Sequence, residues 1–146
     1  MPLVRVSVHD TMAPERRRKI PHAVYDAMRA TINIPENDLF VVLTAHAEGE
    51  LVIDPHFMGM QRTSAFTLVH ITMRRGRTLE MKQALYKEIA ARLHEHAAIP
   101  ADDVMIVISE NELLDWSFGH GVASYVSGDN VPSGLHPAVP SVGGER

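Results

Sequence analysis

The chain has 146 residues, with 14 Lys and Arg against 18 Asp and Glu, so its formal net charge is −4. A content of 45% hydrophobic and 22% charged residues is typical of one globular domain and excludes wholesale disorder. The negative charge disfavours a general nucleic-acid-binding surface. The lack of cysteine excludes disulfides, thiolate nucleophiles and iron–sulfur clusters. No apolar run reaches the roughly 18 residues of a membrane helix. The N-terminus lacks the shape of a signal peptide, so we expect a cytoplasmic protein with no nucleic-acid or membrane partner.

The first half of the chain predicts a strand, a helix and a second strand. Valines alternate with other residues over 2–8, which indicates a strand with one apolar face. Residues 13–32 indicate a helix, because apolar residues recur every four positions from Ile20 to Ile32, and Pro21 is expected to kink it. The sequence Asn33-Ile34-Pro35 ends this helix, and residues 39–45 predict a more buried strand.

The second half repeats this order after a connector over 46–64, which includes a predicted short strand at 51–53. Residues 66–73 predict a strand, and Thr78 is a plausible N-cap for the helix that follows. The sequence Ile99-Pro100 stops that helix, and a returning strand is predicted at 104–108.

These elements predict an α/β domain over residues 1–126, built from two strand–helix–strand halves at about 2–46 and 65–109. Two helices would cover one face of the sheet, and assembly with further copies of the chain would cover the other. Residues 127–146 are rich in Gly, Pro and Ser, which predicts a C-terminal arm or tail.

The N-terminus is a candidate source of an unusual amine. A small residue such as Pro2 permits removal of Met1, which would leave a free prolyl amine at the start of a core strand. A free α-amine titrates near pH 8, about two units below lysine, so it is readily tuned to act as an acid or a base. Taken alone, a Met-Pro start more often marks a processed end with no role. Retention of Met1 would block the Pro2 amine.

Charged residues at the ends of two strands could surround this amine. Strand alternation places Arg75 and Arg77 on one face and Arg74 on the other, and two guanidinium groups on one face can hold a carboxylate. Asp38, just before the second strand, could stabilise a cation or direct a water. The alternatives are a solvated strand end for the arginines and simple turn chemistry for Asp38.

An aromatic segment follows the last predicted strand. Residues 115–121 hold the only Trp of the chain, Trp116, and also Phe118. Such residues in a loop after a strand can wall a pocket, although packing in the core is an equal alternative. The nine histidines show no metal-ligand spacing, and the chain has neither a Gly-rich phosphate loop nor a Gly-x-Ser-x-Gly motif. We therefore expect no metal and no cofactor.

Together these features resemble the tautomerase superfamily, and within it most of all the malonate semialdehyde decarboxylases. The features are Pro2 opening a strand, the two similar halves, the arginines after the third strand and the sequence Trp-Ser-Phe-Gly at 116–119. The resemblance runs from Pro2 to about Asp129. It implies a homotrimer in which the sheets form a central barrel, in agreement with the uncovered sheet face.

The resemblance also implies roles for individual residues. The catalytic proline falls on Pro2, its acidic partner on Asp38, and the arginine pair that binds a small carboxylate substrate on Arg75 and Arg77. The hydrophobic wall of the site falls on three aromatic residues, Trp116, Phe118 and Tyr125. This chain departs from the decarboxylases in having Gly76 where they have proline, and Arg74 as an additional charge.

The function expected from these residues is cofactor-independent decarboxylation, or hydration, of a small 3-oxo acid of the malonate semialdehyde type. A cationic Pro2 would act as an acid or, through an iminium, as an electron sink. The alternative is a tautomerase of 2-oxo acids in which a neutral Pro2 is the general base, and Asp38 favours the first function because it favours the cation. A non-catalytic binding protein on the same scaffold is a third, weaker interpretation.

Overall fold

The computed structural model describes residues 1–126 of the chain. One compact unit runs from Met1 to Glu110, and a second unit begins at Asn111. The tail predicted for residues 127–146 lies outside the described residues, and the domain limits of 1–126 remain a prediction.

The first unit contains most of the regular structure, in the predicted order of strand, helix and strand followed by the same order again. Its first half comprises β1 (Leu3–His9), α1 (Pro14–Arg18), α2 (Ile20–Ile32) and β2 (Val41–His46). Its second half comprises β3 (Thr67–Arg74), α3 (Leu79–Ala97) and β4 (Val104–Asn111). Short 3-10 turns form at Phe57–Gly59, Ala101–Asp103 and, in the second unit, Leu113–Asp115.

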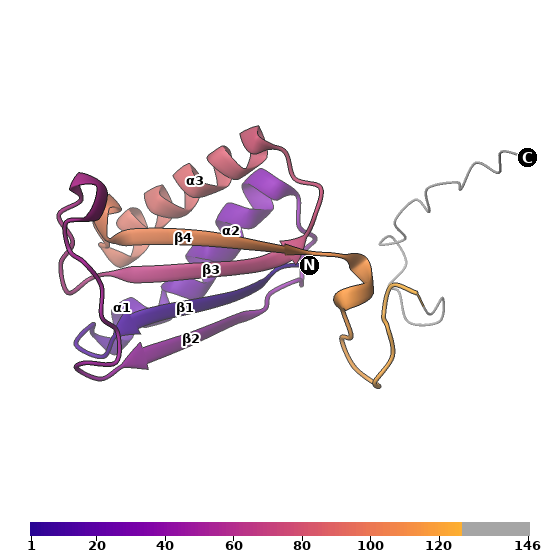
Figure 1. Ribbon diagram of the computed structural model, residues 1–146, viewed down its shortest axis with the longest axis horizontal. Coiled ribbons are helices and arrows are strands. Elements are labelled where there is room, and N and C mark those ends of the chain that lie inside the picture. The colour runs from indigo at the N-terminus through magenta and orange to yellow at the C-terminus, as the bar shows by residue number, and fades with distance from the viewer. Residues whose placement is uncertain (127–146) are drawn as a thin grey trace, which may run out of the picture. The chain divides into compact units, whose positions relative to one another are not determined.

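The strands form one mixed sheet in the order β2-β1-β3-β4, with α2 and α3 on the same side of it (Figure 1). β1 runs parallel to β2 and antiparallel to β3, while β4 runs in the same direction as β3 (Figure 1). Leu3 pairs with Thr72, so the start of β1 lies beside the end of β3. This register brings the N-terminus next to the arginines that follow β3.

The hydrophobic core lies between this sheet and the two helices, as the two periodicities predict. Alternate residues of β1 and β3 are fully buried on the helix side, and so are residues four apart on α2 and α3: Val4, Val6, Val8, Val69, Ile71, Met73, Ile20, Val24, Met28, Leu85, Ile89 and Leu93. The opposite face of the sheet exposes apolar side chains instead, with Val42 at 47%, Met105 at 40% and Val107 at 39% exposure. No helix of the described chain is long and apolar enough to cross a membrane.

The predicted first helix is interrupted ahead of the proline that was expected to kink it. Helix α1 ends at Arg18, Lys19 links it to α2, and Pro21 lies in the first turn of α2. A proline is tolerated there because the first backbone N–H groups of a helix have no partner within it. Asn33 ends α2 in the left-handed conformation, and Thr78 caps α3 by accepting the N–H of Met81 at 3.2 Å, as the sequence predicts.

The short strand predicted at 51–53 does not form, which corrects the sequence analysis. The connector folds into local turns instead. The Glu50 carboxylate accepts the N–H of Ala47 at 3.1 Å, and the Asp54 carboxylate accepts the N–H of His56 at 2.7 Å. Side chains that bond the nearby backbone compete with strand pairing, and a run of three apolar residues is too short to outweigh them.

Candidate active site

The amino end of the chain faces a buried carboxylate. Pro2 is buried just before β1, and the α-amine of Met1 lies 3.3 Å from Oδ2 of Asp38. Asp38 is only 5% exposed, and neither of its carboxylate oxygens accepts a hydrogen bond from another described side chain or backbone group. A buried carboxylate is costly unless a cation compensates it, so this position favours a positively charged neighbour.

The backbone around Asp38 is held from two sides. The N–H of Asn37 donates to the hydroxyl of Tyr25 on α2 at 3.0 Å, and that hydroxyl donates to the carbonyl of Pro35 at 3.4 Å. Two residues after Asp38, the carbonyl of Phe40 accepts the N–H of Val4 at 2.9 Å. Helix α2 and strand β1 therefore fix the turn that presents Asp38 to the amine.

Arginines approach the same amine from the turn after β3. The strand ends at Arg74, and Gly76 has a φ of +125°. The guanidinium of Arg77 turns back to donate to the carbonyl of Arg74 at 3.1 Å. Strand alternation therefore does not continue through this turn, contrary to the sequence analysis, and it does not determine where Arg75 and Arg77 point. Proline could not adopt the φ of +125° found at Gly76, because its ring fixes φ near −65°.

Burial is the largest influence on the amine, and it lowers the pKa of the Met1 α-amine below its usual value. The charge of Asp38 and its hydrogen bond raise that pKa, while the charges of Arg77 and Arg74 lower it further. The pKa of this amine is thus raised by one carboxylate and lowered by two guanidinium groups, and such opposing charges are one way in which proteins tune an acid–base group. Of the predicted site residues, the structure brings Pro2, Asp38 and Arg77 together.

Arg75 faces a different carboxylate. The charge of Arg75 and a hydrogen bond from the Gly76 backbone both act on Glu110, the residue of β4 that ends the first unit. Glu110 also accepts a hydrogen bond from Nζ of Lys82 at 2.8 Å, and this bond is the main cause that lowers the pKa of Glu110. The sequence analysis missed both Lys82 and Glu110, because no local spacing links two residues 28 positions apart.

The predicted aromatic residues gather into one cluster within the second unit. Trp116 stacks on Phe118 with ring centroids 5.4 Å apart, and Phe118 meets Tyr125 edge-on at 5.8 Å. The indole N–H of Trp116 donates to Asn111 at 2.9 Å, and the N–H of Phe118 donates to the hydroxyl of Ser124 at 2.9 Å. These bonds hold the aromatic cluster in place. Within it, Phe118 is 43% exposed.

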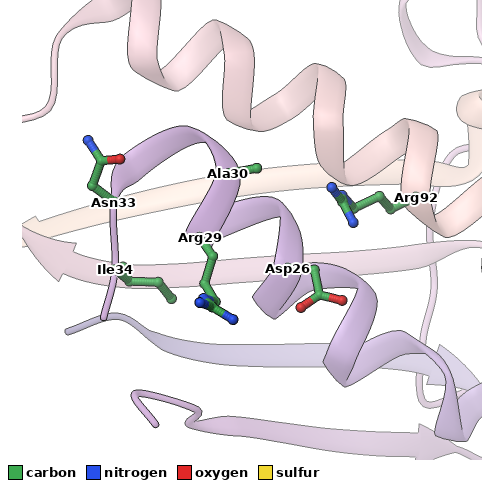
Figure 2. Close-up of a pocket in the computed structure, with 6 residues that line it drawn as sticks. All are labelled: Asp26, Arg29, Ala30, Asn33, Ile34 and Arg92. Carbon is green, nitrogen blue, oxygen red and sulfur yellow. The ribbon is translucent and has the colours of Figure 1, made fainter. Parts of the chain in front are cut away.

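The helix layer carries a separate open hollow of about 520 Å³, shown in Figure 2. Asp26, Arg29, Ala30, Asn33 and Ile34 come from α2 and the residues after it, and Arg92 comes from α3. None of the predicted site residues lines it. Arg92 is paired with Glu88 at 2.7 Å, and Arg29 lies over the ring of Tyr25. The candidate site is therefore identified by its charges at the amino end and not by this hollow.

No group of three His, Asp or Glu side chains in the described part of the chain could hold a metal ion. The site assembled here consists of an amine, a carboxylate and guanidinium groups. Such a donor set suits acid–base chemistry on a small anion.

Comparisons with known proteins agree with this chemistry. A family model described as a tautomerase enzyme matches residues 38–119. The curated Bacillus subtilis (strain 168) protein "Probable tautomerase YusQ" is 32% identical over 126 residues, which cover 86% of this chain and 99% of that protein.

Solved structures give the same result. A malonate semialdehyde decarboxylase inhibited by 3-bromopropiolate is 36% identical, with a TM-score of 0.81, and the match covers 89% of this chain and 99% of that one. A second malonate semialdehyde decarboxylase, described with decarboxylase and hydratase activities, is 30% identical with a TM-score of 0.81 and coverage of 88% and 99%. A fused 4-OT symmetric trimer shares the fold, with 21% identity, a TM-score of 0.68 and coverage of 82% and 94%.

Proposed function

Because this chain belongs to the tautomerase family of enzymes, we propose that it decarboxylates, or hydrates, a small 3-oxo acid of the malonate semialdehyde type. Its catalytic group would be the amine of Pro2 after removal of Met1. The observation that carries the proposal is the Asp38 carboxylate, which is 5% exposed and lies 3.3 Å from the α-amine of Met1, the residue next to Pro2, beside the charges of Arg77 and Arg74. The names of the similar decarboxylases support the substrate class.

The chemistry follows from the charges. A 3-oxo acid loses carbon dioxide when the electrons of the breaking C–C bond can flow into its carbonyl group. A cationic Pro2, favoured by Asp38, would polarise the carbonyl oxygen as an acid. In the other route the neutral Pro2 amine would attack the carbonyl carbon, and loss of water would give a cationic iminium that serves as the electron sink. On the acid route the two-carbon enol takes up a proton at carbon and leaves as acetaldehyde. On the iminium route the enamine bound to Pro2 takes up a proton at carbon, and water then hydrolyses the resulting iminium to release acetaldehyde and the free amine. No cofactor is needed for this sequence.

Arginine would bind the substrate carboxylate and orient the bond that breaks. Arg75 and Arg77 were predicted for this role, and Arg74 joins them as a candidate because its charge acts on the same amine as that of Arg77. The role predicted for Trp116, Phe118 and Tyr125 is a dry wall that favours loss of charge from the carboxylate. Support for this role comes from the resemblance and from the stacking of these rings on one another.

A keto–enol tautomerase is the second candidate, and two observations favour it. Burial and the charges of Arg77 and Arg74 lower the pKa of the Met1 α-amine. After removal of Met1 the Pro2 amine would meet the same groups, which would increase the neutral fraction that a general base requires. The curated relative at 32% identity is named a probable tautomerase. In this case a neutral Pro2 would take a proton from a 2-oxo acid or its enol, and an arginine would again hold the carboxylate.

The proposal includes a homotrimer. The sheet face opposite the helices exposes Val42, Met105 and Val107, and further copies of the chain would cover it. The fused 4-OT of the same fold, which is described as a trimer, supports this arrangement.

The deciding experiment starts with protein whose N-terminal residue has been confirmed as Pro2 by mass. Rapid release of acetaldehyde from malonate semialdehyde, lost in Pro2→Ala, is the expected result. Release of acetaldehyde that persists in Pro2→Ala would remove the amine from the mechanism. Absence of acetaldehyde together with ketonisation of phenylenolpyruvate would replace the decarboxylase with the tautomerase.

A further inference from the structure

A lysine–glutamate pair connects α3 to the end of β4. Nζ of Lys82 lies 2.8 Å from Oε1 of Glu110, and the two side chains are 22% and 23% exposed. Lys82 belongs to the start of α3, where its N–H donates to the carbonyl of the N-cap Thr78 at 3.1 Å. The pair therefore links the start of α3, which follows the turn after β3, to the end of β4.

This turn, residues 74–77, has electrostatic neighbours on both sides. On one side, the charges of Arg77 and Arg74 act on the terminal amine. On the other side, the charge of Arg75 and a backbone hydrogen bond from Gly76 act on Glu110. The bond between Arg77 and the carbonyl of Arg74 closes the turn between them. A shift of the turn at Glu110 would therefore move the guanidinium groups that face the amine.

We propose that Glu110, held in place by Lys82, is a positioning residue that orients the 74–77 turn toward the amine and the substrate carboxylate. This inference rests on the proposed function, because it concerns the arginines assigned to that carboxylate. Glu110 acts through the turn and does not touch the substrate. A pair this exposed adds little to global stability, so its effect is expected on substrate binding.

Two variants separate positioning from simple charge. Glu110→Gln removes a negative charge, and charge alone would strengthen binding of an anion and lower KM. Lys82→Met removes a positive charge, and charge alone would raise KM. Loss of positioning raises KM in both. We expect about a tenfold rise in KM for malonate semialdehyde in each variant, with kcat changed less than about twofold.

Three further measurements test the coupling. The double variant should be no worse than either single variant, because both break the same interaction. Lys82→Arg should restore most of the affinity, since it keeps the cation at this position. Glu88→Gln is the matched control: it breaks the 2.7 Å pair with Arg92 on the same helix and should leave KM unchanged. A fall of KM in Glu110→Gln, or an unchanged KM in both variants, would overturn the proposal.

Titration of the terminal amine by NMR gives a readout independent of turnover. Removing the charge of Glu110 would by itself lower the pKa of the amine, whereas release of Arg74 and Arg77 from the amine would raise it. Positioning therefore predicts a raised pKa of the amine in Glu110→Gln. If the wild-type protein turns over none of the acids tested but the pKa still rises, the proposed function fails and the positioning role stands. An unchanged or lowered pKa would overturn the positioning role whatever the activity.

Discussion

The terminal amine and Asp38 form an ion pair at 3.3 Å, and Asp38 is one of the few buried charged residues of the described chain. Burial, Arg77 and Arg74 each favour the neutral amine, while Asp38 favours the ammonium form. Decarboxylation by polarisation of the carbonyl needs the ammonium form of the amine, whereas tautomerisation needs the neutral form. Asp38 is therefore the residue whose removal separates the two functions most directly.

Asp38→Asn should lower the pKa of the amine further, because the contribution that raises it is lost while those of burial and the arginines remain. If the cation is the active form, the loss of activity with rising pH will begin at a lower pH in the variant than in the wild type. The variant's kcat/KM at pH 7 will then be about 10²-fold lower. If the neutral amine is the base, activity will extend to lower pH instead. The pH profile of kcat/KM distinguishes these outcomes, and an identical profile in the variant would contradict a role for Asp38.

Tyr25→Phe tests the support of the turn before Asp38. The variant leaves the N–H of Asn37 without the hydroxyl that accepts it at 3.0 Å, in a setting where Tyr25 is 8% exposed. We expect a loss of about 1–2 kcal/mol in the free energy of unfolding and a fall in kcat/KM. Denaturant unfolding and steady-state kinetics measure the two effects. Tyr86→Phe on α3, where the side chain is 37% exposed, is the control and should change neither.

The periodic patterns predicted the fold well because the buried side chains of each strand and helix recur at a fixed spacing in the sequence. The alternation of Val4, Val6 and Val8 corresponds to one fully buried face of β1. The four-residue apolar step from Ile20 onward corresponds to the buried face of α2. The similarity of the two halves then predicted the helix-covered sheet, since parallel strands joined by a helix leave few other arrangements.

The site was harder to predict because its contacts are non-local and its backbone is irregular. Alternation could not be extended past Arg74, since Gly76 takes a φ of +125° that no strand contains. The Lys82–Glu110 pair joins residues 28 positions apart, and only the tertiary structure brings them together. Asp38 before a strand looked like ordinary turn chemistry, and its burial against the amine depends on β1 and α2.

The uncovered sheet face predicts how the assembly can be broken. Val107 is 39% exposed on this face, so Val107→Asp would place a charge inside the proposed trimer interface. We expect the trimer to dissociate without loss of secondary structure, as measured by light scattering and circular dichroism. Leu79→Asp at the start of α3 is the control, because Leu79 is 64% exposed on the helix side of the molecule and an acidic residue is favourable in a first helical turn. A trimer that survives Val107→Asp would place the interface elsewhere.

Asp103 is predicted to contribute more to the free energy of unfolding than its neighbour Asp102. Asp103 is fully buried, and its carboxylate accepts both the N–H and the hydroxyl of Thr63 at 2.6 Å, which ties the connector to the start of β4. Asp103→Ala removes a fully buried carboxylate together with its two hydrogen bonds to Thr63, so we expect a loss of about 3 kcal/mol in the free energy of unfolding. Asp102→Ala removes one exposed bond to the N–H of Gln61 at 2.9 Å and should lose about 1 kcal/mol or less. Equal losses in chemical denaturation would show that the burial of Asp103 contributes nothing to its effect.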